Sequence, residues 1–247
     1  YYSVSGEDDW SEITQITNDS LDETFNWNYS WEPEDGEGTY DIMVEATDTA
    51  GNTESSPTVI DVTYDVTEPS VSGISISPDP TNHPPSILAL AVDLLSRIAS
   101  AIFQVDDETF SVPIDLPVQD GVFDSLSEYL FIDEYNTMPY PGEGIHDLYV
   151  GAFDAAGNFG YNSAQFTVDT TAPTLESAET QDADSDGYID GIKLTFSEDI
   201  DDSLLDVGNS DGWDVDGDYE GEAIGTGEND NDNVLLLTFS EGADFDT

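Results

Sequence analysis

The sequence feature that most restricts the fold is an internal repeat. Gly38–Asn52 reads G-T-Y-D-I-M-V-E-A-T-D-T-A-G-N, and Gly144–Asn158 reads G-I-H-D-L-Y-V-G-A-F-D-A-A-G-N, 106 residues later. Each segment runs on to a similar exit, D-V-T-E-P at Asp65–Pro69 and D-T-T-A-P at Asp169–Pro173. Self-similarity at a fixed spacing is typical of tandem modules. The chain therefore contains two copies of one module.

The repeated segment alternates between apolar and polar residues, which predicts a β-strand followed by a turn and a second strand. The turns D-T-A-G-N and D-A-A-G-N contain glycine, which adopts positive φ freely. The residues expected to face inward are Tyr40, Ile42, Val44 and Ala46 in the first copy, and His146, Leu148, Val150 and Ala152 in the second. Short alternating strands with such turns predict an all-β chain of antiparallel β-sandwiches.

One apolar stretch fits two kinds of element. Ile87–Val92 is predicted to be a strand because the module needs one there, although the spacing of its apolar residues also fits a helical stripe. A short helix over Leu94–Ser100 is the alternative. The last part of the chain repeats L-T-F-S-E at Leu194–Glu198 and Leu237–Glu241, which predicts two more alternating strands.

These segments resemble the Ig-like repeats of bacterial and archaeal cell-surface proteins. S-I-S-P-D-P-T-N at Ser75–Asn82 is similar to the same group, and the A-P-T-L opening with T-F-S-E strands resembles a second Ig-like type of surface-layer and secreted proteins. The resemblance implies tandem Ig-like β-sandwich modules at 1–68, 69–171 and 172–247. It also implies a corner tyrosine at Tyr40, from which His146 departs in the second copy.

The repeat also predicts that the first and last modules are incomplete. Ser70–Ala99 precedes the predicted strand Ala101–Val105 in the second copy, whereas the matching strand Tyr1–Val4 opens the sequence in the first. Two explanations are open. The sequence is a piece of a longer repeat protein, or neighbouring copies complete its sheets by strand addition and build a fibre.

The charge balance excludes several classes of function. The 247 residues include 56 Asp and Glu and only two basic residues, Arg97 and Lys193, which gives a net charge of -54. Such a surface repels nucleic acid and offers little to hold a phosphate. No cysteine is present for disulfides, thiolate metal sites or nucleophilic catalysis. The longest apolar stretch, Ile87–Leu95, is too short to span a membrane.

The best local motif is D-A-D-S-D-G-Y-I-D at Asp182–Asp190, which predicts a calcium-binding loop. Oxygen ligands at alternate positions and a glycine at the sixth can wrap a calcium ion. The twelfth position is Lys193, where an EF-hand has glutamate, so the motif resembles the shorter loops of dockerin or thrombospondin-like repeats. The alternative is an acidic turn before a strand. The expected ligands are Asp182, Asp184, Asp186, the Tyr188 carbonyl and Asp190.

Other polar groups give weaker candidates for cations or glycans. Asp48 and Asp154 are expected to hold their turns, while Asp65, Glu68 and Asp169 lie at the exits, where calcium could stiffen a joint. Trp27, Tyr29 and Trp31 either stack on sugars or pack in a core. Further acidic clusters are Asp211, Asp214, Asp216 and Asp218, and Asp230 and Asp232, and the N-glycosylation sequons are at Asn18 and Asn28.

We therefore expect a structural protein of the cell exterior, part of an S-layer, sheath or extracellular fibre that self-assembles with neighbouring copies. Calcium or other cations stabilise its modules in this interpretation. The alternative is an adhesin or carbohydrate-binding stalk, attached to a secreted enzyme or not. An enzymatic role is not expected, because His83 and His146 read as structural or surface residues and no phosphate-binding loop is present.

Overall fold

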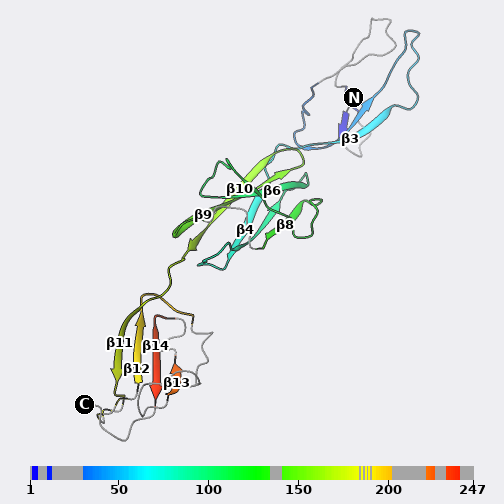
Figure 1. Ribbon diagram of the computed structural model, residues 1–247. Coiled ribbons are helices and arrows are strands. Elements are labelled where there is room, and N and C mark those ends of the chain that lie inside the picture. Colours follow the sequence, from blue (N-terminus) through cyan, green and yellow to red (C-terminus); the bar gives the residue numbers. More distant parts are fainter. Residues whose placement is uncertain are drawn as a thin grey trace. The chain divides into compact units, whose positions relative to one another are not determined.

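The chain is all-β in its computed structural model (Figure 1). The structure describes residues 2–4, 10–12, 30–133, 141–183, 185, 187, 189, 191–201, 221–225 and 232–239. Every regular element among them is a strand, the strands pair antiparallel, and these residues include no helix that could cross a membrane. The strands are β1 Tyr2–Val4, β2 Gly38–Val44, β3 Thr58–Tyr64, β4 Ser70–Ser77, β5 Ser86–Val92, β6 Ile98–Val105, β7 Ile114–Asp115, β8 Ser127–Ile132, β9 Gly144–Asp154, β10 Phe159–Val168, β11 Leu175–Gln181, β12 Gly191–Phe196, β13 Gly221–Gly225 and β14 Val234–Phe239.

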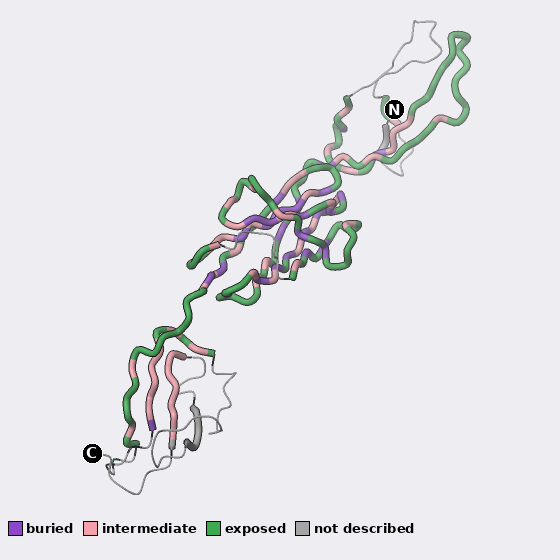
Figure 2. Tube along the Cα trace, in the orientation of Figure 1, coloured by how far each residue is buried: buried purple, intermediate pink, exposed green. Residues whose placement is uncertain are grey.

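The second repeat copy is a β-sandwich of two sheets. One sheet has the strand order β10-β9-β6-β7 and the other β4-β5-β8. Side chains from both sheets form one buried core, in which Ile87, Phe103, Leu130 and Val150 are fully buried. Figure 2 shows that most of the buried stretches of the chain lie in this copy. Alternation along β9 explains its part of this core, since Leu148, Val150 and Ala152 point inward as predicted.

The apolar stretch that fitted two elements is a strand. Ile87–Val92 belongs to β5, which pairs with β4 and β8 in the centre of its sheet, so the strand prediction is confirmed. The helical alternative over Leu94–Ser100 is wrong. Leu94 is 87% exposed in a connection, and Ile98–Ser100 already belongs to β6. Burial alternates along β5, with Ile87, Ala89 and Ala91 buried and Leu88 37% exposed, so the apolar run arises because the outer face of the strand also carries leucine.

The first repeat copy forms the same hairpin with less burial. β2 and β3 pair from Gly38↔Tyr64 to Val44↔Thr58, and β1 pairs with β2. Among the four residues expected to face inward, only Tyr40 is buried. Val44 and Ala46, predicted to face inward, are exposed.

The exits of the two copies are anchored alike. Glu37 accepts hydrogen bonds from the Val66 amide (2.7 Å) and the Thr67 hydroxyl, while Glu143 accepts them from the amide (2.9 Å) and hydroxyl (2.6 Å) of Thr170. Glu37 and Glu143 occupy the same position of the repeat, in Gly-Glu-Gly. A side chain far from the exit in sequence therefore fixes the start of each linker.

The corner position differs between the copies but makes the same contact. The Tyr40 hydroxyl donates to the Gly36 carbonyl at 2.7 Å, as the resemblance implied. In the second copy, Nε2 of His146 lies 2.7 Å from the Gly142 carbonyl, four residues back as in the first copy. Nδ1 of His146 also lies 2.7 Å from Asp106, the only ion pair within the described residues. Because each ring nitrogen faces an acceptor, the doubly protonated imidazolium is favoured.

The last part of the chain, residues 171–247, forms a unit of its own, distinct from the unit 1–170. Its sheet has the order β11-β12-β14-β13. The two L-T-F-S-E strands are neighbours in it, with Leu194 opposite Leu235 and Ile192 opposite Leu237. The module boundaries after 68 and 171, and the incompleteness of the outer modules, stay predictions.

The His146 corner predicts a pH-dependent stability of the second copy. Burial lowers the pKa of His146, but the hydrogen bonds to Asp106 and Gly142 outweigh it, so the pKa is raised above 6.5. A raised folded-state pKa stabilises the fold fully below pH 6.5, and this contribution is lost as the pH rises through the folded-state pKa. Thermal unfolding at rising pH should show this loss. The matched control is His146→Tyr, which restores the residue of the first copy and should lose the dependence. An unchanged profile in that variant would contradict the assignment.

Candidate metal centre

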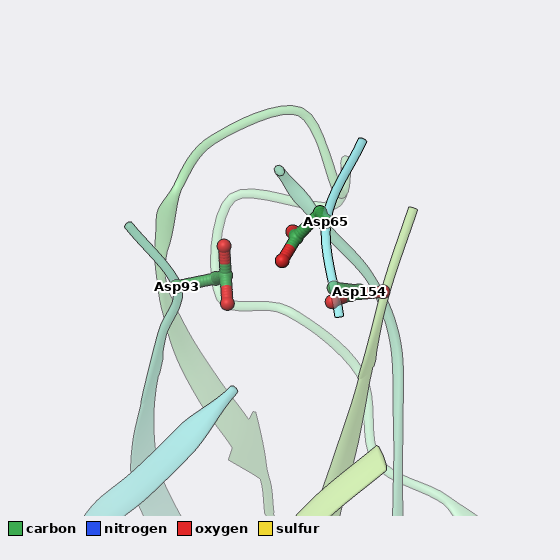
Figure 3. Close-up of side chains that lie close together, drawn as sticks. All are labelled: Asp65, Asp93 and Asp154. Atoms are coloured by element: carbon green, nitrogen blue, oxygen red, sulfur yellow. The ribbon is translucent and has the colours of Figure 1, made fainter. Parts of the chain in front are cut away.

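Three aspartates meet at one end of the sandwich, although they lie far apart in the sequence. Asp65 directly follows β3, Asp93 directly follows β5, and Asp154 is the last residue of β9. One carboxylate oxygen from each lies within 4.8 Å of the other two (Figure 3). Their side chains point toward one another, and the residues are only 6%, 4% and 2% exposed.

Two of these aspartates are held by their own turns. Oδ1 of Asp154 accepts hydrogen bonds from the amides of Gly157 (2.7 Å) and Asn158 (2.9 Å), and its Oδ2 accepts one from the Asn158 side chain. Oδ1 of Asp93 accepts from the amides of Leu95 and Ser96, each at 2.8 Å. Oδ2 of Asp93 accepts no hydrogen bond from the described residues. These turns fix both carboxylates before any ligand binds.

The third aspartate reaches the site because the exit segment packs on the sandwich. Oδ2 of Asp65 accepts a hydrogen bond from the Ser96 hydroxyl, and its carbonyl accepts one from the Asn158 side chain at 3.2 Å. Gly160 makes room for the segment, because a Cβ there would lie 1.9 Å from the Pro69 carbonyl oxygen. The counterpart of Gly160 in the first copy is Glu54, 106 residues earlier.

No side chain of the described residues neutralises these three charges. The guanidinium of Arg97 donates instead to the Phe123 carbonyl, at 2.6 Å. Two like charges about 4 Å apart repel by about 4 kcal/mol at an effective dielectric constant of 20. Repulsion among the three carboxylates therefore opposes their burial together, and the hydrogen bonds from the turns offset part of it. The arrangement is therefore a candidate site for a cation.

The donor set fits a hard divalent cation such as calcium. All three side chains offer carboxylate oxygens, which calcium binds at about 2.3–2.6 Å. Oxygens on opposite sides of one calcium ion are thus about 5 Å apart, and the three carboxylate oxygens, all within 4.8 Å of one another, lie inside that span. Soft metals are disfavoured because the chain has no cysteine.

The first repeat copy has the same aspartate turn as the second but not the cluster of three carboxylates. Asp48 is the counterpart of Asp154 and makes the same turn, accepting hydrogen bonds from the amides of Ala50 (2.9 Å) and Asn52 (2.8 Å). Asp48 is nevertheless exposed. The turn alone therefore does not require a buried carboxylate, and the burial of Asp154 comes from the exit segment packed against it.

The calcium loop predicted at Asp182–Asp190 lies mostly outside the described residues. Asp184, Asp186, Tyr188 and Asp190 are among the residues not described. Oδ2 of Asp182 accepts a hydrogen bond from the Gly187 amide at 3.2 Å, and Gly187 has φ of 97°, so the start of the loop curls back on itself. Calcium binding there stays a prediction.

The remaining candidates are not brought into one site by the structure. Glu68 is exposed, Asp169 lies at the second exit, and Asp232 holds a turn through the Val234 amide at 2.8 Å. Trp31 packs against Tyr40 with ring centroids 5.3 Å apart, as the core interpretation expected. The residues outside the described part are Asn18, Asn28, Trp27, Tyr29, Asp211, Asp214, Asp216, Asp218 and Asp230.

Replacing Asp93 should remove most of the stabilisation that calcium gives to the chain. Asp93→Asn keeps the oxygen that accepts the two turn amides but removes one charge. Without divalent cations the variant should unfold at a higher temperature than the unaltered chain, because repulsion falls. Calcium at ten times the dissociation constant should raise the unfolding temperature of the unaltered chain by about 5 °C, because binding contributes about 1.4 kcal/mol, and should raise that of the variant by much less. Thermal unfolding at constant ionic strength measures both.

The matched control is Asp48→Asn, which changes the same turn residue outside the cluster. Its calcium response should equal that of the unaltered chain. If all three proteins respond to potassium chloride but not to calcium or EDTA, general screening of the charge replaces a specific site.

Comparison with known proteins transfers no function to this chain. No protein-family model matches it, and no curated protein matches it. The function therefore has to be inferred from the residues of the chain itself.

Proposed function

We propose that this chain is a structural segment of the cell exterior, built from tandem Ig-like β-sandwiches whose joint is stabilised by calcium. An S-layer, sheath or extracellular fibre is the setting that suits it. The observation that carries the proposal is the position of Asp65, which ends the first repeat copy yet is buried with Asp93 and Asp154 of the second. A cation bound there holds the exit of one copy to the next.

The proposed cation acts on the linker more than on the core of the sandwich. The linker is already placed by Glu37 on one side and by Ser96 and Asn158 on the other. The repulsion among the three carboxylates opposes this placement. A bound calcium ion attracts all three carboxylates and so favours it. Extracellular modules bind calcium with dissociation constants of about 10⁻⁴–10⁻³ M, so such a joint is stiff outside the cell and loose in a chelator.

The composition supports the same setting. A net charge of -54 makes separate copies repel one another at low ionic strength. Divalent cations or high salt reduce that repulsion and permit close packing. In this proposal the Asp182 loop adds a second calcium site in the unit 171–247, so that cations stabilise more than one place along the chain.

Purified protein should respond to calcium by forming ordered assemblies. We expect negative-stain electron microscopy to show filaments or sheets with a regular repeat at millimolar calcium, and dispersed particles after addition of EDTA. The control is magnesium at the same ionic strength, which prefers a smaller octahedral site and should assemble the protein less well. Monomers at all calcium concentrations that bind a neutral glycan instead would favour the adhesin alternative.

A further inference from the structure

Five aromatic side chains gather on the outer face of the β10-β9-β6-β7 sheet. Along β9 the residues between the core positions, Tyr149 and Phe153, point away from the core. Phe159 and Tyr161 of β10 lie beside them, and Phe110 reaches them from the loop between β6 and β7. Tyr161 is 51% exposed and the other four are partly exposed. We call these five residues the aromatic patch.

The rings contact one another closely. The Phe110 centroid lies 5.3 Å from that of Phe159 and 5.8 Å from that of Tyr161, in edge-to-face contacts. The centroids of Tyr149 and Tyr161 are 6.4 Å apart. Gly151 leaves space for this packing, because a Cβ there would lie 2.5 Å from the Phe159 ring. The patch is thus an ordered surface of rings.

The first repeat copy shows that the hairpin does not need the patch in order to fold. At the matching positions, 106 residues earlier, it carries Met43 for Tyr149, Thr47 for Phe153, Thr53 for Phe159 and Ser55 for Tyr161. The hydroxyls of Thr47 and Thr53 lie 3.0 Å apart, where the second copy places two phenylalanine rings. The aromatic residues are therefore specific to the second copy, and a role beyond the hairpin accounts for them.

The loop that carries Phe110 is held firmly in an unusual backbone conformation. Phe110 has φ of 50°, which is rare for an aromatic residue. Asp107 accepts hydrogen bonds from Thr109 and Ser111, and Gln104 binds both Asp107 (2.8 Å) and the Val112 amide (3.0 Å). Such backbone conformations persist only where the surroundings enforce them, and they concentrate at binding sites.

Carboxylates border the patch on the side of Tyr149. Asp147 lies two residues before Tyr149 on β9 and so shares its face of the strand, while Glu108 lies two residues before Phe110 in the loop. Desolvation and then the negative charges of Asp147 and Glu108 raise the pKa of Tyr149 above 10. Glu108 is exposed and accepts no hydrogen bond from the described residues. Asp147 uses one oxygen for Gln165, at 3.1 Å. Rings flanked by free carboxylates attract organic cations by cation–π and ionic contact together.

We propose that the aromatic patch, with Glu108 and Asp147, binds arginine or lysine side chains of a partner protein. A second copy of this chain does not fit, because the chain has two basic residues and brings another 56 carboxylates. The guanidinium of one of them, Arg97, is bound to the Phe123 carbonyl. The occupant is thus a basic segment of a different protein. This inference does not depend on the proposed calcium joint.

The test uses variants that borrow residues from the first copy. Tyr149→Met with Tyr161→Ser keeps the net charge, so the general attraction of a basic peptide to the chain is unchanged. The probe is the peptide acetyl-Gly-Arg-Gly-Arg-Gly-amide, and amide NMR titration of the full chain measures its affinity. We expect the double variant to bind about tenfold more weakly. Tyr129→Ser, which removes a tyrosine that is 57% exposed on the other sheet, should leave the affinity unchanged.

Three results would overturn the proposal. Equal affinity in the double variant would mean that the rings play no part. Equal binding of a peptide with uncharged citrulline in place of arginine would mean that charge plays no part. Binding of a neutral oligosaccharide that is lost in the double variant, without binding of the arginine peptide, would assign the patch to sugars.

A second pair of variants keeps the test decisive if the double variant does not fold. Glu108→Gln and Glu179→Gln remove the same charge from exposed sites, one beside the patch and one on β11. Glu108→Gln should weaken binding about threefold more than Glu179→Gln. An equal loss in the two variants would leave only general electrostatic attraction and overturn the proposal.

Discussion

The burial of three carboxylates at one end of the second sandwich is the constraint on which the rest of the account depends. Asp65, Asp93 and Asp154 converge in a part of the protein where the described residues supply no cationic side chain. Their mutual repulsion opposes the burial of all three together. The turns at Asp93 and Asp154, the packing of the exit on Gly160 and the anchor at Glu37 all keep these charges together. The calcium joint that we propose would offset this repulsion by binding all three carboxylates.

Comparison of the two repeat copies distinguishes the features that the hairpin needs from the features that only one copy has. Both copies keep the Gly-Glu-Gly anchor, the aspartate turn and a corner side chain that binds the carbonyl four residues back. Only the second copy buries its turn aspartate and carries the aromatic patch. Shared features thus define the hairpin. Features of one copy alone are not required by the hairpin, and we propose that they serve cation binding at the joint and recognition on the outer sheet face.

Much of the fold was predictable because its signals are local. Alternation and turn residues predicted the strands of the repeat, and Ile87–Val92 followed from the needs of the module. The exposure of Val44 and Ala46 was not predictable, because alternation gives the face of a strand but not what covers that face. The candidate site was predicted in part. Asp65 was expected at a joint and Asp154 in a turn, but Asp93 was missed, since it interrupts an apolar run and reads as a strand end. Its meeting with the other two depends on pairing between strands far apart in the sequence.

The most direct test of the account is a crystal structure of the chain grown with calcium, with anomalous scattering used to locate the ion. We predict one calcium ion bonded to oxygens of Asp65, Asp93 and Asp154 at about 2.3–2.6 Å, with further oxygen ligands completing its shell. A site that holds water alone at millimolar calcium would contradict the central claim.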